Sequence, residues 1–208
     1  MTGTGRIPRR FLGFSMIEVL VSLVIIVFGL LGLAGLQVRL QKSELESYQR
    51  AQALILLQDM VDRIRIYRIT ATCFRFTTDT TVGTPFLGVG SGGAPACSAG
   101  TANDNAQATA AMSEWDSLLQ GAAETKGGVG AGAMLGTRGC VSYNTATRLL
   151  DPTGAPIPGT GIYTVTISWA GTINTFAPTD NCGNDNALYG APTLRRAVST
   201  TFRLGSLK

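Results

Sequence analysis

The stretch Phe14–Leu36, FSMIEVLVSLVIIVFGLLGLAGL, decides the fold of this 208-residue chain. Only Ser15, Glu18 and Ser22 interrupt its apolar character over 23 residues. As an α-helix it would be roughly 35 Å long at 1.5 Å per residue. Because the hydrocarbon core of a bilayer is about 30 Å thick, the sequence predicts one membrane-spanning helix near the N-terminus.

Composition excludes several classes of function. Charged residues make up 14% of the chain and histidine is absent, which removes histidine-based catalytic triads, histidine metal sites and histidine pH switches. The net charge is +4, but residues 69–208 carry equal numbers of acidic and basic side chains. A phosphate-binding face needs clustered Lys and Arg, and the pair Arg195–Arg196 is too small for one. We therefore expect no direct binding of nucleic acid.

Charges on either side of the apolar stretch predict its orientation. On the N-terminal side every charged residue is basic; these are Arg6, Arg9 and Arg10. On the C-terminal side, Arg39 and Lys42 are followed by Glu44 and Glu46. Positive charge is retained on the cytoplasmic side of membranes. The expected arrangement is a single pass through the inner membrane, with the N-terminus inside and residues 37–208 in the periplasm.

Two features are unusual for a simple anchor. Glu18 lies five residues into the apolar stretch, where a carboxylate costs about 2.5–3.5 kcal/mol on insertion scales, so a cationic partner is expected. In addition, Gly13 stands between the basic leader and Phe14. Secretory signals are normally cut after their apolar core. A cut after Gly13 would keep the core and leave a free amine on Phe14, four residues before Glu18.

The pattern Gly13-Phe14-Ser15-Met16-Ile17-Glu18 resembles the prepilin signature of type IV pilins and type II secretion pseudopilins. The resemblance implies that a prepilin peptidase cleaves after Gly13 and that Phe14 becomes N-methylated. It also implies that Glu18 pairs with the N-terminal ammonium of a neighbouring subunit during assembly. Two other interpretations stay open: a signal anchor with a chance Gly-Phe, and a Glu18 that only tunes helix depth by snorkelling.

The apolar stretch predicts the first half of a longer helix. No proline or glycine occurs between Leu36 and Val82, and apolar residues recur at helical spacing on one face; these are Leu54, Leu57, Val61 and Ile64. Glu46–Arg50 and Asp59–Arg63 are favourable i,i+4 pairs. We expect one helix from Phe14 to about Tyr67. The expected domains are a removed leader (1–13), a transmembrane half (14–36), an amphipathic half (37–68) and a globular head (69–208).

The head is expected to be strand-rich, with one further helix. Residues 69–103 and 121–139 have the composition of loops, and Asn105–Gln120 has helical spacing with Trp115 as a core residue. Asn103 or Asp104 is the expected N-cap, and Gly121 the expected stop. Candidate strands are Gly139–Asn144, Ile162–Ala170 and Ala197–Leu204. The expected fold class is α+β and type IV pilin-like, with a long N-terminal helix packed on an antiparallel sheet.

Four cysteines lie beyond the membrane stretch, at Cys73, Cys97, Cys140 and Cys182. An even number in a translocated region predicts two disulfides, with three possible connectivities. We favour Cys73–Cys97 with Cys140–Cys182. A zinc site is disfavoured because no CxxC pair exists, and the oxygen-rich segment Asp180–Asn186 does not have calcium-loop spacing. We therefore expect no metal and no other cofactor.

The leading functional hypothesis is a structural assembly subunit. Residues Ser15–Arg65, together with the arrangement of the head, look like the PilV-type minor pilins. That resemblance implies a role in a tip or priming complex supporting adhesion, twitching motility or DNA uptake. The implied partners are the prepilin peptidase, the major pilin, other minor pilins and the inner-membrane assembly platform, with a final location in the extracellular pilus.

Two other functional classes stand beside this hypothesis. A minor pseudopilin of a type II secretion system shares the same signature, so the sequence leaves that alternative open. An enzyme is not expected. The only paired carboxylates considered, Glu114 and Asp116, stand two apart on a predicted helix and do not face each other.

Overall fold

The computed structural model describes residues 13–122, 125–126, 129–130 and 134–205. The leader predicted for residues 1–13 therefore lies outside the described part except for Gly13. The chain divides into two compact units, Met1–Leu45 and Glu46–Lys208. The long helix α1, Met16–Ile66, belongs to both, because the boundary falls within it. Its expected extent, Phe14 to about Tyr67, is confirmed to within two residues at each end.

The described part of the N-terminal unit, residues 13–45, consists of the first part of α1 and the three residues before it. Every described residue from Gly13 to Leu45 is exposed, since no other element of the unit covers the helix. A helix can form without such cover because its backbone hydrogen bonds are all internal. It is the one helix, among the residues that the structure describes, long and apolar enough to cross a membrane.

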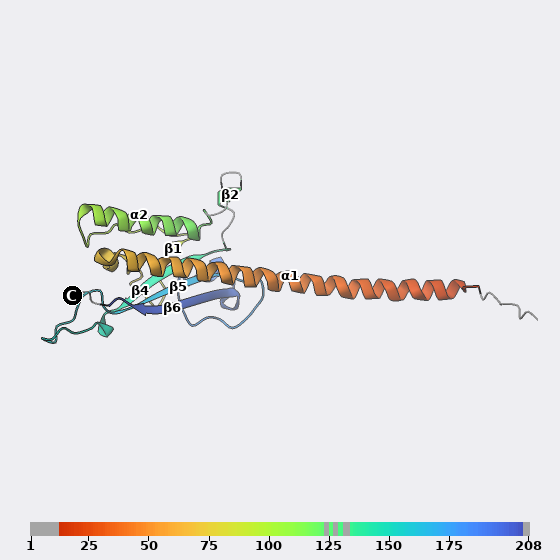
Figure 1. Cartoon of the computed structure of the whole chain (residues 1–208). Helices are drawn as coiled ribbons and strands as arrows, with labels where there is room; N and C mark the ends of the chain where they lie inside the picture. The colour runs from red at the N-terminus through yellow and green to blue at the C-terminus, as the bar shows by residue number, and fades with distance from the viewer. Residues whose placement is uncertain (1–12, 123–124, 127–128, 131–133, 206–208) are drawn as a thin grey trace, which may run out of the picture. The chain divides into compact units, whose positions relative to one another are not determined.

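The second unit, called the head below, is built on an antiparallel sheet. Four strands are hydrogen-bonded in the order β1-β4-β5-β6 (Figure 1); they are β1 (Leu87–Gly88), β4 (Arg138–Asn144), β5 (Ile162–Ala170) and β6 (Arg195–Arg203). The register places Val141 opposite Val165, and Val165 opposite Thr200. The strand predicted at Ile162–Ala170 matches β5 at both ends.

Both helices of the head contribute to one core. Helix α2 spans Ala102–Leu119 and runs alongside the C-terminal part of α1 in the opposite direction (Figure 1). The core side chains come from both helices, from the 3-10 helix that follows α1, and from β1, β4 and β5; the largest fully buried ones include Trp115, Tyr163, Phe74, Met60, Ile64, Leu87, Met112, Leu119, Ile167 and Val141. This arrangement confirms the α+β class, a long N-terminal helix packed on an antiparallel sheet.

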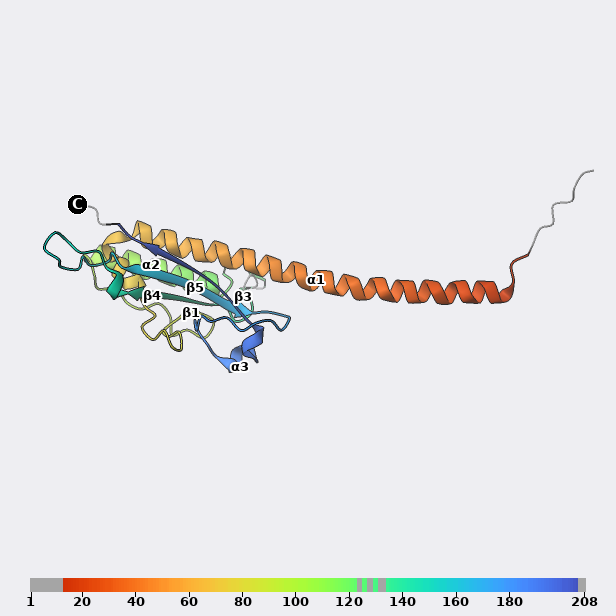
Figure 2. The ribbon, with the colours of Figure 1, turned by 90° about the horizontal axis from the view of Figure 1, so that it is seen from below.

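Part of the second face of the sheet is covered, at the end where Figure 2 shows α3. The connection from β5 to β6 crosses this face and includes the short helix α3, Asn186–Tyr189. Ser168, a polar residue of β5 that alternation alone would place in solvent, is fully buried. Its hydroxyl is 2.9 Å from the carbonyl of Cys182 and 3.1 Å from the hydroxyl of Tyr189. At Ser168 the connection therefore buries a polar side chain of β5 and satisfies it with hydrogen bonds.

Trp115 acts as the core residue that the sequence predicts. It is fully buried, and its Nε1 donates to the carbonyl of Leu56 on α1 at 2.9 Å. Its ring lies directly against Gly139 of β4, where a Cβ atom would come within 2.1 Å of the indole. Glycine is therefore required at that position, because any side chain would displace Trp115 and separate α2 from the sheet.

The structure corrects several local expectations. Thr101 caps α2 in place of Asn103 or Asp104, with Asp104 completing a capping box. The segments expected to be loops contain short elements: a 3-10 helix at Arg68–Phe74, β1, and the two-stranded ribbon of β2 (Thr125–Lys126) and β3 (Val129–Gly130). These elements are too short to give a periodic pattern in the sequence.

Candidate functional site

The Gly13–Phe14 peptide bond lies outside the helix. Gly13, Phe14 and Ser15 are non-helical, and α1 begins at Met16. The carbonyl of Ser15 accepts hydrogen bonds from the amides of Glu18 at 3.0 Å and Val19 at 3.3 Å. The side chain of Phe14 is 84% exposed. The bond is therefore in an exposed, non-helical segment that is accessible to a peptidase.

Glu18 lies in the first turn of α1, where the partial positive charge of a helix N-terminus favours a carboxylate. Its side chain is exposed, and none of the ion pairs formed by the described residues involves it. The structure thus brings Phe14 and Glu18 to the same end of one helix, with the Glu18 carboxylate available to an external cation.

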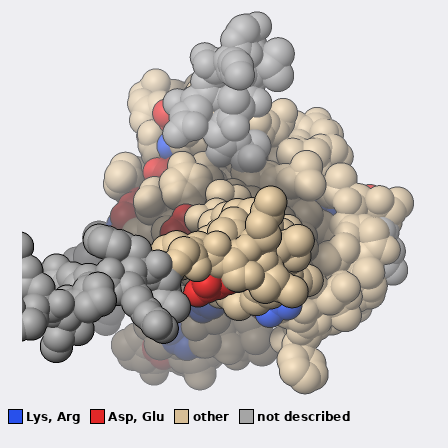
Figure 3. Space-filling view, turned by 90° about the vertical axis from the view of Figure 1, so that its right-hand side faces the viewer, with Lys and Arg blue, Asp and Glu red and all other residues tan. Residues whose placement is uncertain are grey.

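The surface that follows Glu18 is apolar on all sides. Its most hydrophobic 18-residue window has a mean hydropathy of 2.8 and no buried residue. Figure 3 views the molecule from the right-hand side of Figure 1. Most of the described surface in that view belongs to neither acidic nor basic residues. Exposed apolar area of this extent is unfavourable in water. Contact with lipid or with other apolar helices removes it from water. This part of the chain therefore supports a single-pass membrane anchor.

The carboxylates considered for catalysis have structural roles. Glu114 pairs with Arg63 at 2.7 Å, and Arg63 also binds Asp59 at 2.8 Å, so α1 and α2 are joined. Burial opposes the charge on Arg63, but its bonds to Glu114 and Asp59 outweigh that effect and raise its pKa. The carboxylate of Asp116 is bound separately, by the amide of Gly88 at 2.6 Å. The expected Asp59–Arg63 pair is thereby confirmed.

The expected Glu46–Arg50 pair is wrong. Glu46 turns instead to the connection after β5, where one carboxylate oxygen accepts from the amides of Thr172 at 3.1 Å and Ile173 at 3.2 Å. Arg196 of β6 completes the cluster at 3.0 Å. Burial tends to raise the pKa of Glu46, but the Thr172 amide and the Arg196 charge outweigh it and lower the pKa below its ordinary value. Sequence spacing could not reveal this contact, since it joins residues 150 positions apart.

Two disulfides join the four cysteines in the pairing that the sequence analysis favours. Cys73 is bonded to Cys97, which ties the 3-10 helix to the segment before α2. Cys140 of β4 is bonded to Cys182, which holds the covering connection on the sheet. Among the residues that the structure describes, no group of three or more Cys, Asp or Glu side chains could hold a metal ion. The Asp180–Asn186 segment forms a turn in which the amide of Asn184 donates to the carbonyl of Asn181.

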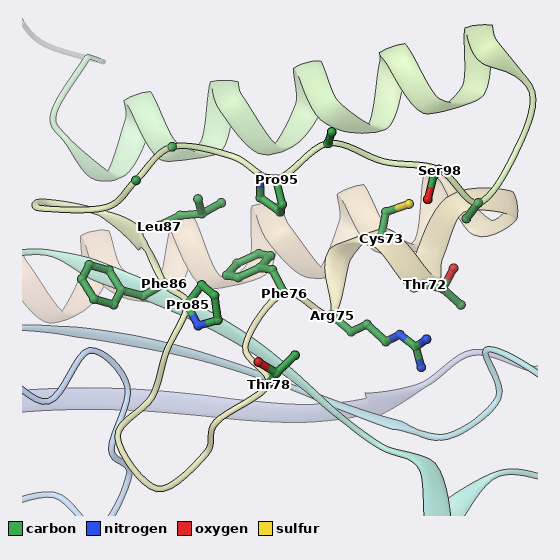
Figure 4. A pocket seen from close by; sticks show the side chains of 14 residues that line it. Thr72, Cys73, Arg75, Phe76, Thr78, Pro85, Phe86, Leu87, Pro95 and Ser98 are labelled. Carbon is green, nitrogen blue, oxygen red and sulfur yellow. The ribbon is translucent and has the colours of Figure 1, made fainter.

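The head also contains an open cavity of about 520 Å³. Figure 4 shows the side chains of Phe76, Pro85, Leu87 and Pro95 forming its apolar walls, beside the disulfide-bonded Cys73. Arg75 is the one charged residue among the described residues that line it, and its guanidinium lies over the Tyr143 ring, 5.5 Å from the ring centre. The described residues that line it include no acidic side chain.

Comparison with known proteins identifies the N-terminal signal. Residues 8–34 match the family model described as the prokaryotic N-terminal methylation motif. The match includes Gly13, Phe14 and Glu18, whose geometry is given above. No curated protein and no solved structure gave a significant match to the chain. The chain therefore carries the prokaryotic N-terminal methylation motif, the signal of the type IV pilin and pseudopilin family.

Proposed function

We propose that this chain is a minor pilin of the PilV type, held in the inner membrane and then incorporated into a type IV pilus, where it serves a tip or priming complex. The observation that carries this proposal is the combination of an accessible Gly13–Phe14 bond with a continuous apolar helix that begins at Met16. A subunit with that combination can leave the bilayer only by exchanging lipid contacts for contacts with other apolar helices. Adhesion, twitching motility or DNA uptake would follow from the assembled fibre.

The proposed processing assigns a role to each part of the chain. The prepilin peptidase removes residues 1–13 on the cytoplasmic side, and Phe14 is N-methylated. Residues 14–36 span the membrane, residues 37–68 form the spine of the head, and residues 69–208 complete the periplasmic head. Glu18 then pairs with the ammonium of a neighbouring subunit, which would stabilise a carboxylate that is otherwise costly in an apolar environment.

The processing proposal is tested by the intact mass and N-terminal sequence of protein purified from its native membranes without reductant. We expect an N-methylated Phe14 at the start, and a mass lowered by two hydrogens for each of the two disulfides. Gly13→Ser should retain the leader, whereas Gly35→Ser, at another exposed glycine of the same unit, should be processed normally. A Gly13→Ser protein that still began at Phe14 would refute the assignment of the cleavage site.

A minor pseudopilin of a type II secretion system remains the second candidate, because the matched motif is common to both kinds of subunit. Deletion of the gene distinguishes them. We expect loss of surface pili with normal secretion of extracellular enzymes, restored by wild type but not by Gly13→Ser. Normal pili with impaired secretion would assign the chain to the secretion system instead.

A further inference from the structure

The open cavity of the head is built from three segments that the fold ties together. Its lining residues lie within residues 72–78, 85–87 and 92–99. The disulfide Cys73–Cys97 joins the first segment to the third. The hydroxyl of Thr77 donates to the carbonyl of Pro85 at 2.8 Å, which joins the first segment to the second. The cavity is therefore preformed, and its volume of about 520 Å³ is within the range of about 300–1,000 Å³ that is usual for ligand sites.

The lining of this cavity has an apolar side and a polar side. Figure 4 shows Phe76, Pro85 and Leu87 together on one side of Arg75. Thr72 lies on the other side of Arg75 and adds a hydroxyl group. A ligand that fills the cavity must therefore carry an apolar group next to a polar or charged one.

Arg75 supplies a positive charge without an acidic partner among the described residues. It takes part in none of their ion pairs, and the described lining contains no acidic residue. Its guanidinium is stacked over the Tyr143 ring, an arrangement that leaves the N–H groups in the guanidinium plane able to donate. Arginine binds a carboxylate through two parallel hydrogen bonds. One cation matches one carboxylate, whereas a phosphate monoester would bring a charge of about −1.5 to −2.

The third segment also offers its backbone to a ligand. Residues 91–98 form no helix or strand, and no backbone–backbone hydrogen bond within the described part of the chain uses the amide of Ala96 or Ser98. Gly92 and Gly93 leave the chain uncovered, since a Cβ atom added to either would meet nothing within 4 Å. Extended peptides bind such a wall through main-chain hydrogen bonds while their side chains enter the adjoining pockets. The wall therefore favours a peptide over a free small molecule.

We propose that this cavity binds an extended peptide segment of a partner protein, in which an aromatic or branched apolar side chain stands next to a carboxylate. The apolar side chain packs against Phe76, Pro85 and Leu87, and the carboxylate accepts hydrogen bonds from Arg75. The inference requires neither cleavage after Gly13 nor a choice between a pilus and a secretion system, because every residue that lines the cavity belongs to the head.

The test uses the full chain in lipid nanodiscs and two matched peptides, acetyl-Pro-Phe-Glu-amide and acetyl-Pro-Phe-Gln-amide, each with one fluorine on the Phe ring. Broadening of the fluorine NMR signal measures binding, after subtraction of the signal change caused by empty nanodiscs. Arg75→Gln removes the charge and Arg75→Lys retains it, while Ala96→Trp fills the cavity. Arg203→Gln is the matched control, because Arg203 is an exposed arginine of β6 that does not line the cavity. Near-ultraviolet circular dichroism checks that each variant is folded.

We expect the Glu peptide to bind wild type about threefold more tightly than the Gln peptide, as for an ion pair near the surface. Arg75→Gln should abolish this difference, Arg75→Lys should keep part of it, and Ala96→Trp should weaken both peptides. Arg203→Gln should match wild type.

Equal binding of the two peptides to wild type would overturn the proposal, and so would loss of the difference in Arg203→Gln. Fluorinated phenylpropionate that bound as tightly as the Glu peptide would overturn the assignment to a peptide, because the backbone of the peptide would then contribute nothing. Neither result bears on the cleavage after Gly13, which the mass of the mature chain tests separately.

Discussion

The two halves of α1 share one backbone geometry but meet different surroundings. From Met16 to Leu45 every side chain is exposed, whereas the half within the head buries residues along one face; the buried ones are Gln49, Ala53, Leu56, Leu57, Met60, Val61 and Ile64. The first half thus depends on contacts outside the chain, and the second on contacts inside it. Helix formation and helix function are therefore separable. The backbone hydrogen bonds form locally, whereas the role of each side chain is set by the lipid, protein or water that surrounds it.

The largest expected effect concerns a contact confined to the head. Replacing Cys140 and Cys182 together by serine should cost about 4 kcal/mol of unfolding free energy, because the bond closes a loop of 42 residues. Replacing Cys73 and Cys97 should cost about 3 kcal/mol, since that loop is 24 residues long. Denaturant unfolding of the full chain in detergent, followed by tryptophan fluorescence, measures both. A smaller effect for the longer loop would show that loop length does not decide the order.

A matched pair of leucines then compares the two halves directly. Leu57 is 4% exposed within the head and Leu31 is 64% exposed in the apolar half. Leu57→Ala should lower the unfolding free energy of the head by about 3 kcal/mol through lost burial and the cavity left behind. Leu31→Ala should leave it unchanged, as thermal unfolding followed by near-ultraviolet circular dichroism can measure. Equal effects would contradict the division of α1 into an internally and an externally packed half.

Removal of the carboxylate in the apolar half should have opposite effects on insertion and on assembly. Glu18→Ala should insert more favourably, by about 2–3 kcal/mol, because the desolvation cost disappears. We expect the same variant to join complexes of partner subunits at least about tenfold less well, equivalent to about 1.4 kcal/mol. Quantitative co-purification from native membranes measures this, with Glu44→Ala, another exposed acidic residue of α1, as the control. Wild-type recovery of partners with Glu18→Ala would refute the pairing role.

The smallest expected effect lies where the two halves meet. Glu46→Gln should destabilise the head by about 1 kcal/mol near neutral pH, because Thr172, Ile173 and Arg196 lose a charged acceptor. Since the pKa of Glu46 is lowered on folding, its contribution is complete above the ordinary value of 4.5 and declines as the pH falls below it. The difference between wild type and variant should therefore shrink on acidification. A difference that grew at low pH would contradict the sign of the shift.

The local pattern of apolar and polar residues was sufficient to predict the long helix and the main strand. The apolar stretch, and the helical spacing that continues it, predicted α1 closely, and the alternation from Ile162 to Ala170 predicted β5 at both ends. Trp115 was placed correctly in the core because its helical face is apolar. In each case the responsible interaction acts between neighbours in sequence or repeats along one face, so the sequence carries the signal directly.

The functional motif was equally local. Gly13, Phe14 and Glu18 lie within six residues, and their significance comes from the order in which a basic leader, a small residue and an apolar core follow one another. No local sequence motif indicated the Glu46 cluster, the cavity beside Arg75 or the exposed position of Phe176. Each is made by segments that are far apart in the chain, so no window of sequence contains it.

The sequence by itself therefore determined the membrane helix, the methylation motif, the main strand and the location of the cysteines beyond the apolar stretch. Only the tertiary structure decided which charge meets Glu46, why Gly139 must lack a side chain and how Ser168 becomes buried on the outer face of β5. The physical reason is that hydrophobic periodicity and backbone hydrogen bonding repeat along the chain, whereas ion pairing and close packing depend on segments that folding alone brings together.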